Sequence, residues 1–191
     1  RQRAAPDQVR RLTGGKPSRI SPIMQRGKTT LWLLAALFTA GCIIPPPAGT
    51  PLPPRVEILG DHTRASLYGK SAADMLDHPA IREKVRSLFG SDWGGGAVGG
   101  PGVAAAAPEF FSRSFPPRLI QVRGWEYVAA SGCMANACRT HRGLLLVRSD
   151  GGELLARLDE GGYTHYYVFG VGMLATPENR AAIDAVRRAL E

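Results

Sequence analysis

Five short runs rich in leucine, aromatic and β-branched residues constrain the fold of this chain more than any other feature. They occupy residues 119–123, 125–130, 143–148, 153–158 and 163–170. Runs of this length, bounded by glycine-containing segments, are typical of β-strands. Residues 149–152 read Ser-Asp-Gly-Gly and residues 160–162 read Glu-Gly-Gly, which favours tight hairpin turns. The pattern predicts an antiparallel meander of about five strands.

An amphipathic helix is predicted before this meander. Asp77 and Pro79 suit a helix start, and Gly90 suits its end because glycine readily ends a helix. Between them the apolar residues recur at the spacing of one helix face: Ile81, Val85, Leu88 and Phe89. We expect this helix to pack its apolar side on another element.

A second helix is predicted at the end of the chain. Thr176 suits an N-cap, and proline and glutamate follow it in the first turn. The apolar stripe of this helix consists of Ile183, Val186 and Leu190, so we expect it to lie across the sheet. The predicted fold class is therefore α+β, with an N-terminal helix and a C-terminal helix packed on an antiparallel sheet.

Residues 24–41 have the organisation of a secretory signal. Met24 is followed by Arg26 and Lys28, and then by a mostly apolar stretch of about ten residues, half of the roughly 20 that cross a bilayer. The stretch ends in Ala-Gly-Cys, which resembles the bacterial lipobox, whose cysteine is acylated on sulfur and becomes the new N-terminus. We expect Cys42 to carry a lipid that anchors the protein in the cell envelope, facing the periplasm. Ile43 favours the outer membrane.

The remaining segments divide the chain further. Residues 1–23 precede the first methionine and show no apolar periodicity, so we interpret them as an upstream segment outside the translated protein. Residues 42–60 are rich in proline and predict a stiff tether. Residues 61–191 are expected to form one domain. Within it, residues 94–107 are mostly glycine and alanine and are expected to be flexible.

The net charge of +8 belongs mainly to the signal region and not to the domain. Eight of the 24 basic residues and one of the 16 acidic residues lie in residues 1–41. Residues 42–191 therefore carry 16 basic and 15 acidic side chains and are nearly neutral. Because nucleic-acid binding depends on phosphate neutralisation by basic side chains, we expect no nucleic-acid partner.

The three cysteines predict one disulfide. Once the lipid takes Cys42, an oxidising compartment favours a bond between Cys133 and Cys138. The alternative is that these two cysteines and His141 ligate a metal ion, although the spacing is unusual and no fourth ligand is evident. A disulfide would close a short loop, which either inserts rigidly into a partner's cleft or only connects two strands.

Sequence motifs for catalysis are lacking. The chain contains no nucleophile elbow, no phosphate-binding loop and no zinc-protease motif. Asp150, Glu153, Asp159 and Glu160 cluster around predicted turns, where carboxylates usually keep a surface solvated. We expect no enzymatic activity, no catalytic residue and no cofactor.

The segment around the cysteines combines several motifs: Gly-Trp-Glu-Tyr-Val at residues 124–128, Ser-Gly-Cys at 131–133, two cysteines with four residues between them, and the strand 143–147 with its Asp-Gly turn. In these motifs the segment resembles the Ivy family, the bacterial inhibitors of vertebrate lysozyme. More loosely, the resemblance covers roughly the last 115 residues. It implies an antiparallel sheet with helices packed on it, in agreement with the periodicity.

The resemblance also implies a function. In that family the loop usually reads Cys-Lys-Pro-His-Asp-Cys, and its histidine enters the lysozyme active site between the two catalytic carboxylates. Here Asn136 stands at the histidine position. We expect an envelope lipoprotein whose loop blocks a c-type lysozyme or a lytic transglycosylase, or else a non-inhibitory structural or binding module of the same fold. The expected loop residues are Met134, Ala135, Asn136, Ala137, Arg139 and His141.

Overall fold

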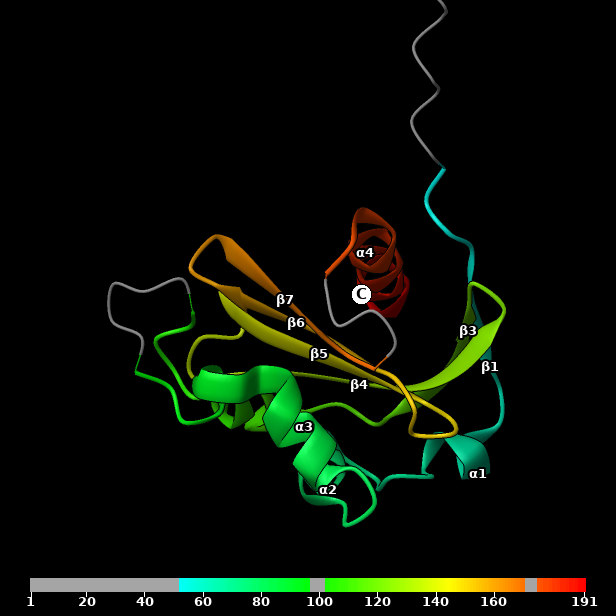
Figure 1. Ribbon diagram of the computed structural model, residues 1–191, viewed down its shortest axis with the longest axis horizontal. Helices are drawn as coiled ribbons and strands as arrows, with labels where there is room; N and C mark the ends of the chain where they lie inside the picture. Colours follow the sequence, from blue (N-terminus) through cyan, green and yellow to red (C-terminus); the bar gives the residue numbers. More distant parts are fainter. Residues whose placement is uncertain (1–51, 97–101, 171–174) are drawn as a thin grey trace, which may run out of the picture. The chain divides into compact units, whose positions relative to one another are not determined.

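The computed structural model describes residues 52–96, 102–170 and 175–191, all within one compact unit, Ala48–Glu191. These residues form an antiparallel sheet with helices on both faces, which confirms the α+β class (Figure 1). The predicted signal segment and Cys42 lie outside the described residues. Among the helices that are described, none has the length and apolar character needed to span a bilayer.

The described part of the sheet has seven strands in the order β1-β3-β4-β5-β6-β7, and β2 also pairs with β4. Their bounds are β1 Val56–Leu59, β2 Arg113–Ser114, β3 Arg118–Val122, β4 Trp125–Cys133, β5 His141–Arg148, β6 Leu154–Glu160 and β7 Tyr163–Phe169. Strands β3 to β7 are the predicted meander, and both predicted hairpin turns connect them. The expected number of about five strands was too low, since β1 and β2 were missed.

Strand β1 corrects the predicted extent of the tether. Residues 42–60 were expected to form a spacer, but Val56–Leu59 pairs with β3 from Val56 opposite Val122 to Leu59 opposite Leu119. Val56 and Leu59 pack against buried residues, which explains why this short segment joins the sheet.

Four α-helices are described: α1 His62–Ala65, α2 Ala72–Asp77, α3 Arg82–Phe89 and α4 Pro177–Leu190. Helix α3 is the predicted first helix. It ends at Gly90, whose φ of 53° lies in the left-handed region. Its predicted start was wrong, because Asp77 ends α2 instead. Two 3₁₀ helices, η1 Gly90–Trp93 and η2 Ala107–Phe111, follow α3.

Helix α4 forms as predicted. The Thr176 hydroxyl accepts a hydrogen bond from the Asn179 backbone N–H at 3.3 Å, which caps the helix. Ile183 and Val186 are fully buried, and Leu190 packs beside them. The apolar stripe therefore lies on the sheet.

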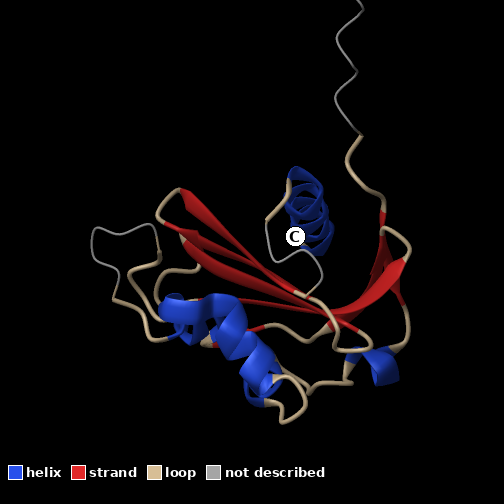
Figure 2. Cartoon of the chain, viewed as in Figure 1, coloured by secondary structure: helices blue, strands red, loops and turns tan. Residues whose placement is uncertain are grey.

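Two apolar clusters hold the sheet between its helices (Figure 2). On the α4 side, Ile183 and Val186 meet the inward side chains of the sheet, which are Ile120, Val122, Tyr127, Ala129, Leu144, Leu146 and Leu155. On the opposite side, α2, α3 and η2 cover Leu119, Val128, Ala130, Leu145, Val147, Leu154, Ala156 and Leu158. Alternate residues of β4 and β5 therefore enter different clusters, as the period of a strand requires.

The glycine and alanine segment is packed where it is described, contrary to the expectation of flexibility. Val103 and Ala107 are fully buried. The Glu160 carboxylate accepts hydrogen bonds from the backbone N–H groups of Ala104 and Ala105, at 3.1 and 3.3 Å. Glu160, which is distant in sequence, thus holds this segment in place. The composition of the segment alone gives no sign of this contact. Residues 97–101 lie outside the described residues.

Two glycines let η2 lie directly on the sheet. Gly132 and Gly143 face each other across β4 and β5. A Cβ atom on Gly143 would lie 2.6 Å from the ring of Phe111, which is itself buried. The absence of a side chain at residue 143 is therefore a packing requirement.

We predict that Gly143→Ala lowers the free energy of unfolding by about 1–3 kcal/mol, because the added methyl overlaps an immobile ring. Gly60→Ala is the matched control, since no atom lies within 4 Å of its added Cβ, and it should change stability by less than about 0.5 kcal/mol. Urea denaturation followed by circular dichroism measures both. Equal stability of the two variants would contradict this account of the η2 contact.

Candidate functional site

Cys133 and Cys138 are joined by a disulfide between β4 and β5, as predicted, with their Cα atoms 4.9 Å apart. The enclosed loop is also held by hydrogen bonds. The Met134 carbonyl accepts from the Ala137 N–H at 2.9 Å, and the Ala137 carbonyl accepts from the His141 N–H at 2.8 Å. The Ala135 N–H donates to the Ser112 hydroxyl at 3.1 Å. The loop is thus tied to itself and to the segment beside β2.

The tip of this loop faces solvent. Ala135 and Asn136 are exposed, whereas Met134 and Ala137 are half-buried. The exposed part of the tip carries one side-chain amide and no charge. It can donate and accept hydrogen bonds but cannot form an ion pair.

The basic residues that follow the loop, His141 and Arg142, do not lie on the same face of the sheet. Arg142 lies on the α4 side of β5, in line with Leu144, whereas His141 lies on the other side, in line with Leu145. The His141 ring stacks at a tilt on buried Phe110, with centroids 5.9 Å apart, and its Nε2 lies 3.9 Å from the Glu160 carboxylate. His141 is therefore a packed residue turned away from the α4 side.

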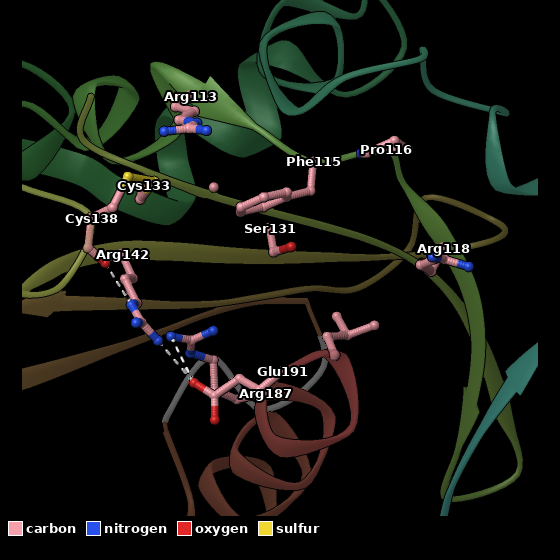
Figure 3. Close-up of a pocket in the computed structure, with 12 residues that line it drawn as sticks. Arg113, Phe115, Pro116, Arg118, Ser131, Cys133, Cys138, Arg142, Arg187 and Glu191 are labelled. Atoms are coloured by element: carbon pink, nitrogen blue, oxygen red, sulfur yellow. Dashed lines mark hydrogen bonds and ion pairs between the residues drawn. A yellow bond between two sulfur atoms is a disulfide. The ribbon is translucent and has the colours of Figure 1, made fainter. Parts of the chain in front are cut away.

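A groove of about 770 Å³ opens beside the disulfide, on the α4 side of the sheet (Figure 3). It lies where the last turn of α4 comes next to the end of β4 and the start of β5. Its walls come from the disulfide, from the segment between β2 and β3, and from the last turn of α4. The lining residues are Arg113, Phe115, Pro116, Arg118, Ser131, Gly132, Cys133, Cys138, Arg142, Arg187, Leu190 and Glu191.

The groove is strongly basic, with four guanidinium groups and one carboxylate among its lining residues. The Glu191 carboxylate holds Arg142 and Arg187, each at 3.1 Å. The Arg142 Nε also donates to the Cys138 carbonyl at 2.7 Å, which fixes this side chain against the loop. Partial burial lowers the pKa of Arg187 from its usual value, but arginine remains protonated in proteins.

Arg139 is exposed at the edge of a neighbouring depression of about 530 Å³. This depression shares Arg142, Arg187 and Glu191 with the groove. Asp159 lies in it, 3.6 Å from Arg187, and also accepts from Arg157 at 2.8 Å. Arg139 thus extends the basic surface beyond the loop.

The turn carboxylates are more enclosed than expected from the sequence. Asp150 is exposed but pairs with Arg148 at 2.8 Å, whereas Glu153 is half-buried and accepts a hydrogen bond from the Tyr127 hydroxyl at 2.7 Å. Asp159 and Glu160 make the contacts described above. Burial, followed by the bond to Glu153, raises the pKa of Tyr127 above its usual range. These contacts give the carboxylates structural roles within the domain.

The disulfide also removes the metal-site alternative, because Cys133 and Cys138 use their sulfur atoms in the bond. Within the described ranges, no group of three potential ligands is placed to hold a metal ion.

No protein-family model, curated protein or solved structure matches this chain.

We predict that the double variant Cys133→Ala, Cys138→Ala loses about 2 kcal/mol of unfolding free energy, since the disulfide closes only a short loop. Urea denaturation is the measurement. Dithiothreitol should destabilise the wild type by a similar amount and leave the variant unchanged. If the stability of the wild type does not change when its cysteines are shown to be reduced, a stabilising role for this bond is contradicted.

Proposed function

We propose that this chain is an exported, lipid-anchored binding protein that blocks a glycan-cleaving enzyme. In this proposal the disulfide loop enters the active-site cleft of a c-type lysozyme or a lytic transglycosylase, and the chain itself is not a catalyst. The observation that carries the proposal is the combination of an exposed tip with a tightly fixed base. The export signal and the resemblance to the Ivy family support it from the sequence.

The fixed base favours insertion. The disulfide, the turn hydrogen bonds and the bond from Ala135 to Ser112 hold the loop before any partner binds. Ordering a flexible loop on binding costs free energy, and a loop already in one conformation avoids most of that loss. The tip is also small, with alanine on both sides of Asn136, so it suits a narrow cleft.

Asn136 defines what the tip can do in such a cleft. Its amide group can donate to a carboxylate, and its oxygen can accept from a protonated carboxyl group. A retaining glycosidase uses one carboxyl group as an acid and another as a nucleophile, so hydrogen bonds to both would block the reaction. Because the amide is neutral, we expect weaker inhibition than from a histidine at the same place.

A non-inhibitory binding module is the second candidate. The uncharged tip favours it, and so does the position of His141, which packs on Phe110 and faces away from the α4 side of the sheet. In that case the loop would serve only to connect β4 and β5, and another surface would bind the partner. The enzyme assay below separates the two candidates.

We predict that the full chain, kept in a neutral detergent, slows peptidoglycan cleavage by a c-type lysozyme or a lytic transglycosylase. Asn136→His should strengthen inhibition about tenfold, since a hydrogen bond to a charged group contributes about 1.5–3 kcal/mol. Asn136→Asp should abolish inhibition through repulsion between carboxylates. If neither the wild type nor Asn136→His inhibits either enzyme, insertion of the loop is refuted.

We further predict that Cys42 carries the lipid. In bacteria fed an alkyne-tagged fatty acid, the wild type should be labelled and should sediment with membranes, whereas Cys42→Ser should be unlabelled. Cys133→Ser is the matched control and should keep its label, because that position contributes only to the disulfide. Labelling of Cys42→Ser at the level of the wild type would exclude this residue as the lipid site.

A further inference from the structure

We propose that the arginine groove binds an extended acidic polypeptide segment that also carries an apolar side chain. The groove is defined by Arg113, Phe115, Arg118, Ser131, Arg142 and Arg187. This inference goes beyond the proposed function and does not rest on it, because the groove lies beside the loop and excludes its exposed tip. A partner of any activity could supply the segment.

Two prolines create the opening. Strands β2 and β3 both pair with the same edge of β4, and the Phe115 N–H still donates to the Ser131 carbonyl at 2.9 Å. Pro116 and Pro117 follow, and they have no N–H group to continue the ladder. The pairing with β4 is therefore interrupted at the two prolines and resumes at Arg118 opposite Ala129, which leaves one extra residue at the edge of β4 beside the groove.

Phe115 gives this opening an apolar surface. Phe115 is 52% exposed, although burial of a large aromatic side chain is usually favourable. In Figure 3 the ring projects into the groove between Arg113 and Arg118. Pro116 and Leu190 also line the groove. An apolar side chain of a ligand can therefore pack in the middle of a charged surface.

The charge of the groove is uncompensated at two of its four arginines. Arg113 and Arg118 are exposed, and neither guanidinium makes a hydrogen bond or ion pair with a residue in the described part of the chain. Arg142 and Arg187 share the side-chain carboxylate of Glu191, and Arg187 also lies 3.6 Å from the Asp159 carboxylate. Because residues 42–191 are almost neutral overall, this local excess of positive charge marks a place for an anionic partner.

The chemistry of the groove favours carboxylates on an extended chain. Guanidinium groups are donors only and form paired hydrogen bonds with carboxylates. A hydroxyl-rich glycan also needs acceptors, and the one carboxylate here is already engaged by two arginines. Figure 3 shows Arg113 and Arg118 on either side of Phe115, so the charges do not converge on one small anion. The apolar ring between them fits a peptide with mixed side chains.

This chain itself offers no such segment. Asp7 is the only acidic residue in the parts that the structure leaves undescribed. The only two acidic residues adjacent in sequence are Asp159 and Glu160, and both already make internal contacts. A second copy is thus a poor source of an extended acidic segment. The occupant is expected to be a different protein.

The test is calorimetric titration of the full chain, in neutral detergent, with the peptide Gly-Glu-Glu-Phe-Glu-Glu-Gly, blocked at both ends. We expect saturable binding that weakens about tenfold in the double variant Arg113→Gln, Arg118→Gln, since charge-assisted hydrogen bonds are lost. Phe115→Ala should also weaken binding. The matched control is Arg55→Gln, Lys70→Gln, which removes the same charge from exposed positions outside the groove and should bind like the wild type.

Three further results decide the inference. A peptide with all four glutamates changed to glutamine should fail to bind if carboxylates are recognised. Equal weakening in the groove variant and in the matched control would show that only net charge matters and would overturn the site. Tighter binding of polygalacturonate or of single-stranded oligothymidylate than of the peptide would overturn the polypeptide assignment. Circular dichroism of each variant verifies that all of them are folded.

Discussion

Strands β4 and β5 are buried on both faces, and the rest of the domain is arranged around this requirement. Leu144 and Leu146 of β5 enter the cluster under α4, while Leu145 and Val147 enter the cluster under α2, α3 and η2. A sheet with apolar side chains on both faces needs a cover on each side. Helix α4 supplies that cover on one side, and its last turn lines the groove at the end of the β4–β5 pair beside the disulfide.

The fold was largely predictable because its main signals are local. Short apolar runs, glycine turns and the Thr176 cap each depend on neighbouring residues, and all of them were recovered. Strand β1 was not, since four residues after a proline-rich stretch gain their order from β3. The packing of Val103 was also missed, because Glu160 and the core that order its segment lie far away in sequence. Contacts between distant segments explain both errors.

The site was predictable only in part for the same reason. The disulfide follows from the cysteine count and the expected oxidising compartment, but the groove joins residues from β2, β3, β4, β5 and α4. Arg113 and Arg118 both line the groove because two short strands share the edge of β4. The spacing of residues in the sequence does not predict that arrangement. One signal was available. If β5 is extended back to residue 141, strand alternation already places His141 and Arg142 on opposite faces.

The loop and the groove are adjacent but chemically different, so we propose that they serve as separate contact surfaces at one end of the domain. Mapping of backbone amide shifts in the ¹⁵N-labelled chain, during titration with a c-type lysozyme or a lytic transglycosylase, tests this account most directly. The account predicts the largest changes at residues 134–137, with further changes at 113–118 if the partner also fills the groove. Changes confined to α2 and α3, or no changes with either enzyme, would contradict it.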